Sequence, residues 1–375
     1  MFSHYNQNNS SPTNEQKLLL QAALWQGEAA INSWQTWRKT VNIDDIDRES
    51  YRLLPLVYRN LSAHNVTDSH LGRLKGVYRR TWVENQVLFQ EIASILDALK
   101  SAGIETMLLK DAALNLYYYQ DYGLRTIENF DFLIRTKDVL NAIPLLEKLD
   151  WKIQGNIANP KIPFTHIVGF KKEPKQYLNL RWHLFGEGFN ENAENQFWQS
   201  AILTQVNNLP VYVLSPTEQL LYTCGSGIFR NSVSPVRRLV DAAIAIYTYP
   251  DRINWHHLIE LAENYRLLLP LKTQLIQLSE ILNAPIPASI LLELENLPVS
   301  QMEQEEYQVL TGEKTTILER LKMRYFQYLR ISKNAQFNLI GFLHYLQYVW
   351  GLENLWEVPI QVTSRTIQRI GFKKT

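Results

Sequence analysis

The feature that most constrains this chain is an aspartate inside an apolar strand. Residues Phe130–Arg135 read FDFLIR, a run whose aromatic and branched side chains favour an extended conformation. A carboxylate in such a strand is costly to bury unless it is paired with a cation, hydrogen-bonded or bound to a metal. Asp131 therefore needs a partner from elsewhere in the fold, and it is the first candidate for a functional residue.

A predicted strand and a predicted helix come before this aspartate. The pattern predicts a strand over Glu105–Leu109 and a helix over Asp111–Gln120, with Lys110 where the strand gives way to the helix. Gly103 follows a long apolar-periodic segment and is expected at the C′ position of that upstream helix. The succession of strand, helix and strand predicts a small α/β unit around Asp131.

The remainder of the chain divides by its hydrophobic pattern. Apolar residues three and four apart mark helices at both ends, whereas short apolar runs separated by prolines mark strands in the middle. We predict an α+β fold, with a small mixed sheet flanked by N-terminal and C-terminal helical regions. The predicted divisions are a disordered arm (1–14), an N-terminal helical region (15–102), an α/β core (103–214) and a C-terminal helical domain (215–375). Further strands are predicted at 151–154, 166–171, 177–182 and 211–214.

Composition excludes several classes of protein. A formal charge of +1 over 375 residues gives no broad attraction to nucleic acid or to an anionic membrane. The single cysteine, Cys224, excludes an internal disulfide and a multi-cysteine zinc site, and it is expected in the core. The first residues lack the apolar segment of a secretory signal, and no apolar run has the length of a membrane span. We therefore expect a cytoplasmic protein that binds neither membrane nor nucleic acid.

Several sequence blocks, in order over residues 90–265, resemble a known family. The blocks are Leu-Leu-Lys at 108–110, Gly-Leu-Arg at 123–125, Asn-Phe-Asp-Phe-Leu-Ile at 129–134, Ser-Pro-Thr-Glu-Gln-Leu-Leu at 215–221 and Leu-Val-Asp-Ala-Ala at 239–243. They resemble an uncharacterised nucleotidyltransferase group within the DNA polymerase β-like superfamily. Its members read roughly Leu-Lys-Gly, and then Arg-(three residues)-Asp-Ile-Asp-Leu-Leu-Val.

The resemblance implies a chemistry and roles for particular residues. It implies Mg²⁺-dependent transfer of a nucleoside monophosphate from an NTP to a hydroxyl of a small molecule, a peptide or a protein. In that reading Asp131 is the catalytic residue and the metal ligand, because the family's two carboxylates at positions i and i+2 of a strand point to the same face and bind Mg²⁺ together with phosphate oxygens. Lys110, Arg125 and Arg181 would hold the nucleotide, and Asp241 would have a supporting role.

The chain departs from the family pattern at acidic positions. Asn129 and Asn179 stand where the family has carboxylates, and as amides they are at most weak, uncharged metal ligands. Arg181 replaces a histidine, and Asp111 replaces the glycine after the lysine. A second hypothesis is therefore a catalytically degenerate member that binds a ligand or a partner. A third is a kinase-like or other phosphate chemistry that uses one carboxylate and several cations.

Structural roles remain open for several of these residues. Asp131 could instead be a buried carboxylate paired with Arg125 or Arg181. Asp111 is most simply a helix N-cap. Asp241 lies on a predicted helix, where an ion pair on the helix surface with a neighbouring arginine is an alternative to a role in the cleft. Arg181 and His183 could line an anion pocket or form a solvated strand face.

Overall fold

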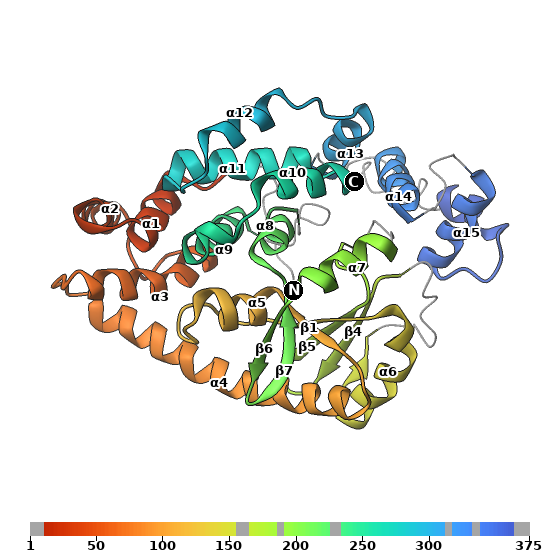
Figure 1. Cartoon of the computed structure of the whole chain (residues 1–375), viewed down its shortest axis with the longest axis horizontal. Coiled ribbons are helices and arrows are strands. Elements are labelled where there is room, and N and C mark those ends of the chain that lie inside the picture. Colours follow the sequence, from red (N-terminus) through yellow and green to blue (C-terminus); the bar gives the residue numbers. More distant parts are fainter. Residues whose placement is uncertain are drawn as a thin grey trace, which may run out of the picture.

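A computed structural model gives the fold. It describes residues 11–154, 165–185, 191–225, 234–311, 317–331 and 338–363, so residues 1–10 of the predicted arm lie outside the described part. A sheet of seven strands lies among helices from both ends of the chain (Figure 1). The predicted α+β class with helical flanks is confirmed. Among the described residues, no helix is both long enough and apolar enough to cross a membrane.

The elements follow in chain order. The N-terminal helices are α1 (Asn14–Leu24), α2 (Gly27–Thr40), α3 (Arg48–Ala63) and α4 (Leu71–Ser101). The strands are β1 (Thr106–Leu109), β2 (Phe130–Ile134), β3 (Lys152–Ile153), β4 (Ile167–Lys172), β5 (Gln176–Arg181), β6 (Ile202–Val206) and β7 (Leu209–Val213). Between them lie α5 (Lys110–Ala113), the π-helical segment η1 (Leu114–Tyr119), the 3₁₀ turn η2 (Thr136–Asp138), α6 (Val139–Lys148) and α7 (Glu191–Ser200). The C-terminal elements are α8 (Pro216–Gly225), α9 (Pro235–Thr248), the 3₁₀ turn η5 (Pro250–Arg252), α10 (Trp255–Asn264), α11 (Leu268–Leu282), α12 (Ala288–Asn296), α13 (Gln301–Thr311), α14 (Ile317–Ile331) and α15 (Leu339–Trp350).

The sheet places β2, the strand that carries Asp131, at its centre. The strand order is β3-β4-β5-β2-β1-β7-β6, with β2 antiparallel to β1 and parallel to β5. Asp131 is level with Leu109 of β1 on one side and with Asn179 of β5 on the other. The residues that follow Leu109 on one side and Asn179 on the other can therefore reach Asp131.

The two faces of the sheet pack against different helices. Leu108, Phe132 and Ile134 belong to a core shared with α4 and α6, which lie along the lower side of the molecule in Figure 1. Leu109 and Leu133 belong to a second core shared with α8 and α9 on the other side. Because side chains alternate along a strand, Asp131 is on the same face as Leu133 and points toward the α8–α9 layer.

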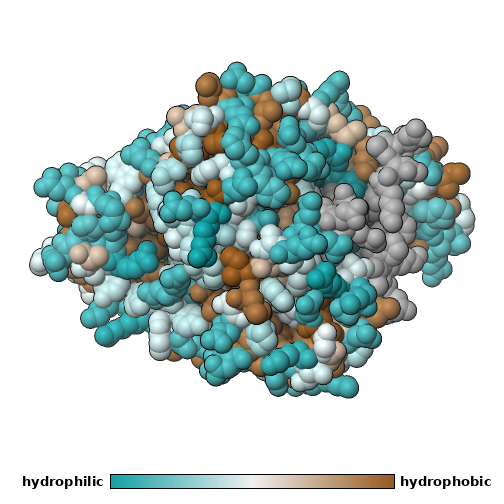
Figure 2. All heavy atoms as spheres, viewed as in Figure 1, coloured by the Kyte–Doolittle hydropathy of each residue, from teal (hydrophilic) through white to brown (hydrophobic). Residues whose placement is uncertain are grey.

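The outer surface is mostly polar on the side that Figure 2 shows. Hydrophilic residues cover most of the coloured surface, and hydrophobic residues form smaller groups among them. Cys224 is buried, as expected from its apolar surroundings. Gly103 has a positive φ of 74° directly after the last residues of α4, which confirms the predicted C′ glycine.

Candidate functional site

The Asp131 carboxylate is buried and holds two cations. The residue is 1% exposed, and its Oδ1 accepts a hydrogen bond of 2.9 Å from Nε of Arg181. Nζ of Lys110 lies 3.1 Å from the same oxygen. Arg181 comes from β5 and Lys110 from the end of β1, so the two strands that flank β2 bring a cation to each side of the carboxylate. We call Lys110, Asp131 and Arg181 the central site.

Lys110 has an unusual backbone. Its φ of 50° is in the left-handed region, which costs a non-glycine residue about 1–3 kcal/mol. This conformation turns the chain from β1 directly into α5 while the ammonium group stays beside Asp131. The Lys110 side chain is 30% exposed, whereas that of Arg181 is 12% exposed. The central site therefore opens to solvent on the side of Lys110.

The two asparagines adjoin the central site. Asn179 is the direct neighbour of Asp131 in the parallel β2–β5 ladder, and Asn129 comes two residues before Asp131 on the same chain. Both residues are half-buried. Within the described residues, neither side chain makes a hydrogen bond, nor does Oδ2 of Asp131 receive one. Their oxygen atoms are thus available to a ligand.

Arg125 does not reach the central site and instead binds Asp241. Its Nε and Nη2 each lie 2.7 Å from an oxygen of the Asp241 carboxylate, a bidentate pair between buried side chains. The hydroxyl of Tyr119 donates a hydrogen bond of 2.7 Å to the same carboxylate. The alternative that Arg125 pairs with Asp131 is therefore wrong, and so is an ion pair of Asp241 on the surface of its own helix.

Asp111 extends this buried charge network. Its Oδ1 lies 2.8 Å from Nη1 of Arg125 and its Oδ2 3.1 Å from Nη2 of Arg237, and Oδ2 also accepts a hydrogen bond of 2.9 Å from the backbone N–H of Glu128. The N-cap of α5 is Leu109, so the predicted capping role of Asp111 is wrong. The carboxylate that replaces the family glycine is a structural anion between two arginines.

These charges shift the pKa values of the groups involved. Burial alone would raise the pKa of Asp111, but Arg125 and Arg237 outweigh it and hold that pKa below its ordinary value. Burial likewise opposes the charged form of Arg125, yet Asp111 and Asp241 raise its pKa well above the ordinary value. Burial and the Asp241 charge raise the pKa of Tyr119, so its hydroxyl stays protonated and donates. The network is fixed in its charged form.

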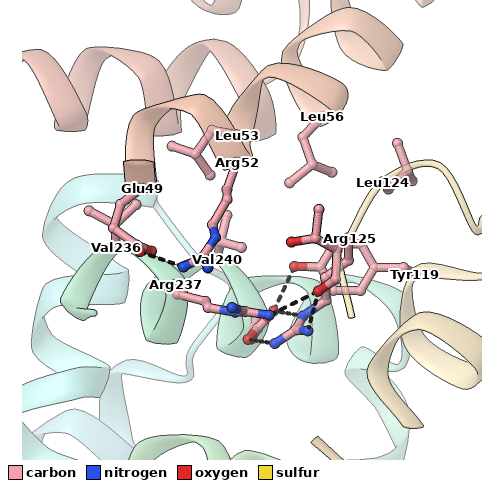
Figure 3. Close-up of a pocket in the computed structure, with 12 residues that line it drawn as sticks. Glu49, Arg52, Leu53, Leu56, Tyr119, Leu124, Arg125, Val236, Arg237 and Val240 are labelled. Atoms are coloured by element: carbon pink, nitrogen blue, oxygen red, sulfur yellow. Dashed lines mark hydrogen bonds and ion pairs between the residues drawn. The ribbon is translucent and has the colours of Figure 1, made fainter. Parts of the chain in front are cut away.

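A small cavity lies beside this network, between α3 and α9 (Figure 3). Its volume is about 20 Å³, room for roughly one or two water molecules. The side chains that line it are those of Glu49, Arg52, Leu53, Leu56, Tyr119, Leu124, Arg125, Thr126, Val236, Arg237, Val240 and Asp241. The cavity is therefore lined by both charged and apolar side chains.

A family profile described as "Uncharacterised nucleotidyltransferase" matches residues 49–283, more than half of the chain. The chain belongs to this family. The matched region begins in α3 and ends just after α11, so it contains the sheet, the central site and the Arg125–Asp241 pair. The resemblance stated from the sequence blocks is confirmed.

Two solved structures are also similar to this family member. The solution structure of the antibiotic-resistance factor ANT(2'')-Ia matches with a TM-score of 0.37 and 12% identity, over 48% of this chain and 92% of that one. An antigenic nucleotidyltransferase-like protein from Paracoccidioides brasiliensis matches with a TM-score of 0.33 and 17% identity, over 57% and 96%. At these values neither likeness bears on the chemistry of the site. No curated protein matches the chain in sequence.

The donor groups of this nucleotidyltransferase family member do not fit a site for two Mg²⁺ ions. Asp131 is the only carboxylate in the central site, and Lys110 and Arg181 already neutralise it. Asn129 and Asn179 supply neutral oxygens only. In the part of the chain that the structure describes, no three His, Cys, Asp or Glu side chains are grouped to hold a metal. Hard divalent cations prefer several carboxylate oxygens, which this arrangement lacks.

The sequence reasoning also missed residues at the site. His183 and Arg181 do not form a solvated strand face, since His183 is buried and Arg181 nearly so. The sequence did not assign Arg52 and Glu128 to the charge network. In the structure Arg52 contacts Glu128, and Glu128 contacts Arg237 of that network. No local sequence signal identified these partners; a buried carboxylate such as Asp111 or Asp241 requires a nearby cation, but the local sequence does not say which one.

Proposed function

We propose that this protein binds a nucleoside triphosphate at the central site without two-metal catalysis. The observation that carries the proposal is the pairing of Asp131 with both Lys110 and Arg181. Two protein cations already contact Oδ1 of the carboxylate that a catalytic metal ion would need as a ligand. This favours the degenerate, ligand-binding member of the family over an efficient transferase.

When the nucleotide binds, Lys110 would exchange the Asp131 carboxylate for a phosphate group as its charge partner. Lys110 is partly exposed, so its flexible ammonium group can turn from Asp131 to a phosphate oxygen at small cost. Arg181 stays on Asp131 and adds positive potential below the phosphates. Asn129 and Asn179 offer amide groups that no described residue uses as hydrogen-bonding partners. Binding by these groups needs no divalent cation.

A second candidate function is Mg²⁺-dependent nucleotidyl transfer to a small molecule, a peptide or a protein. Family membership favours it, and so does Oδ2 of Asp131, which accepts no hydrogen bond from any described residue. Other phosphate chemistry is a third prediction from the sequence. Mass spectrometry of reaction products separates these two, because an added nucleotide and an added phosphate differ in mass.

Calorimetry with ATP, GTP, CTP and UTP, each in EDTA and in Mg²⁺, tests the first proposal. We expect binding of at least one nucleotide in EDTA, and about tenfold weaker binding by Lys110→Gln, which loses one charged contact. Asp131→Asn removes the internal competitor of the phosphates and should tighten binding in EDTA. If the protein is instead a transferase, Asp131→Asn should abolish Mg²⁺-dependent turnover and weaken nucleotide binding in Mg²⁺.

Restoring the family carboxylates gives an independent test. The double variant Asn129→Asp with Asn179→Asp should gain Mg²⁺-dependent nucleotide binding that the wild-type protein lacks. Wild-type turnover at a rate similar to that of the double variant would contradict the proposal of a ligand-binding protein. Binding that is absent for all four nucleotides in both buffers would defeat both candidate functions.

A further inference from the structure

Three arginines surround one carboxylate next to the central site. Oε1 of Glu128 lies 2.5 Å from Nη2 of Arg48 and also contacts Nη2 of Arg52, while its Oε2 lies 3.3 Å from Nη1 of Arg237. Glu128 is 33% exposed at its side chain and Arg48 is 68% exposed, so the group opens to solvent. We call Arg48, Arg52 and Arg237 the arginine cluster.

The arginine cluster is assembled from two separate helices. Arg48 and Arg52 are one turn apart at the start of α3, and Arg237 is in the first turn of α9. Figure 3 shows Arg52 extending from α3 toward Arg237 at the edge of the cavity. Nothing in the local sequence of either helix requires these guanidinium groups to converge. Their convergence is a property of the folded molecule, and like charges at close range repel unless an anion lies between them.

Arg52 is partly buried and lies near two carboxylates and a second arginine. Arg52 has one further partner, Glu49, whose Oε1 lies 2.5 Å from its Nη1. Even so, burial and then the neighbouring Arg237 lower the pKa of Arg52 to about 10. Arg237 shares its second anion, Asp111, with Arg125. All three arginines of the cluster contact Glu128, so an anion that replaced this carboxylate would meet all three guanidinium groups.

We propose that the arginine cluster is an oxyanion site for the phosphate or carboxylate group of a small-molecule ligand, and that the Glu128 side chain fills this site when the ligand is absent. This inference goes beyond the proposed function, because the cluster contacts none of the three residues of the central site. The cavity beside it gives the ligand's next atoms an apolar wall of Leu53, Val236 and Val240.

Exchange of Glu128 for a ligand is physically reasonable. A guanidinium group binds phosphate and carboxylate oxygens in the same planar geometry, and phosphate brings more charge and more acceptor oxygens than one glutamate. The backbone N–H of Glu128 is held by Asp111, so the chain stays in place while the exposed side chain swings into solvent.

Inorganic phosphate is the probe for the first test, titrated into the full chain by calorimetry at constant ionic strength. Removing the internal competitor with Glu128→Gln should tighten phosphate binding about tenfold, and adding Arg48→Gln to that variant should remove the gain. Glu105→Gln is the matched control, because Glu105 forms an exposed pair with Arg135 elsewhere. Equal phosphate affinity in the Glu128 and Glu105 variants would overturn the proposal.

Two further measurements keep the outcome clear. Thermal melting shows whether each variant folds; if Glu128→Gln does not, Arg48→Gln alone should still weaken phosphate binding by the wild-type chain, since Arg48 is largely exposed. Retained affinity in that variant would contradict the proposal.

Acetate titrated in parallel identifies whether the arginine cluster prefers a phosphate or a carboxylate group. Lys110→Gln should weaken NTP binding while the gain from Glu128→Gln persists, so failure at one site is distinguishable from failure at the other.

Discussion

At the scale of single residues, a buried ion pair in the site region joins Arg125 to Asp241. The pair is bidentate, buried and supported by the Tyr119 hydroxyl. Replacing Asp241 with asparagine would leave the guanidinium with too little negative charge around it, and breaking one partner of a buried pair costs about 3–5 kcal/mol. We expect urea denaturation of Asp241→Asn to show a loss of unfolding free energy in this range.

A surface pair provides the control for that measurement. Glu84 and Arg80 are one turn apart on α4 and exposed, so Glu84→Gln should leave the unfolding free energy almost unchanged. Similar effects of the two substitutions would mean that burial does not strengthen the Arg125–Asp241 pair.

Asp111 makes stability depend on pH in a defined direction. Its pKa in the folded protein is lowered from the ordinary value of 3.8, so its carboxylate contributes stability that is fully present above pH 3.8. That contribution is lost as the pH falls through the lowered pKa. We expect wild type to exceed Asp111→Asn by about 3 kcal/mol at pH 7, and the difference to shrink only below pH 3.8. Denaturation curves at several pH values measure this, and a difference that already shrinks between pH 7 and 5 would contradict it.

At the scale of elements, the start of α3 controls one side of the cavity. The Asp47 carboxylate accepts hydrogen bonds of 2.8 Å and 3.0 Å from the backbone N–H groups of Glu49 and Ser50. These bonds cap the helix that carries Arg48 and Arg52. Asp47→Ala should therefore lower the unfolding free energy by about 1 kcal/mol in urea denaturation. Because Asn also caps helices well, Asp47→Asn should recover most of that loss, and an equal loss in both variants would argue against capping.

The elements show which parts of the fold could be predicted from sequence. β2 and β5 were predicted because their apolar runs have strand character and lie between turn residues. β6 was missed, although the Asn207-Asn208 pair is a usable turn signal in the sequence. In the structure both asparagines have positive φ and form the two-residue turn that joins β6 to β7.

The charge partners were harder to predict than the strands. Local spacing suggested that Asp241 would pair with an arginine on its own helix, whereas its partner is 116 positions away in sequence. A buried carboxylate demands a cation, but the identity of that cation is set by how α9 packs on the segment before β2. The partner of Asp131 was easier to predict, because Arg181 lies two residues after Asn179, the residue opposite Asp131 on the adjacent strand.

At the scale of the whole molecule, charge pairs connect regions that the sequence pattern separates. Glu128 and Asp111 come from the segments around β1 and β2, Arg52 from the N-terminal helices and Arg237 from the C-terminal ones. The division into four regions remains a prediction. The contacts nevertheless mean that a ligand at the arginine cluster would hold α3, α9 and the strand that carries Asp131 together. Because none of these side chains contacts Asp131, substitutions at the arginine cluster could act on the central site only through the positions of these elements.

A buried carboxylate links two of the C-terminal helices, α13 and α14, to the family-matched region. Glu306 of α13 lies 2.5 Å from Nε of Arg330 on α14 and 3.3 Å from Nε of Arg266, which follows α10. Arg330 also donates a hydrogen bond of 2.9 Å to the backbone carbonyl of Tyr265. Removing the Glu306 charge leaves these guanidinium groups without their common anion. We expect Glu306→Gln to destabilise the attachment of α13 and α14 by about 3 kcal/mol.

Hydrogen exchange measured by mass spectrometry can localise that effect. In Glu306→Gln, peptides from α13 and α14 should exchange faster, while peptides from β1, β2 and β5 keep their protection, because the core that these strands share with α4 and α6 lies within the family-matched region. Glu305→Gln is the control on the same helix, since the Glu305 side chain is exposed and accepts a hydrogen bond from Gln301. Nucleotide affinity at the central site should be unchanged in both variants. Loss of protection across the sheet in Glu306→Gln would instead mean that the C-terminal helices and the nucleotidyltransferase core unfold as one cooperative unit.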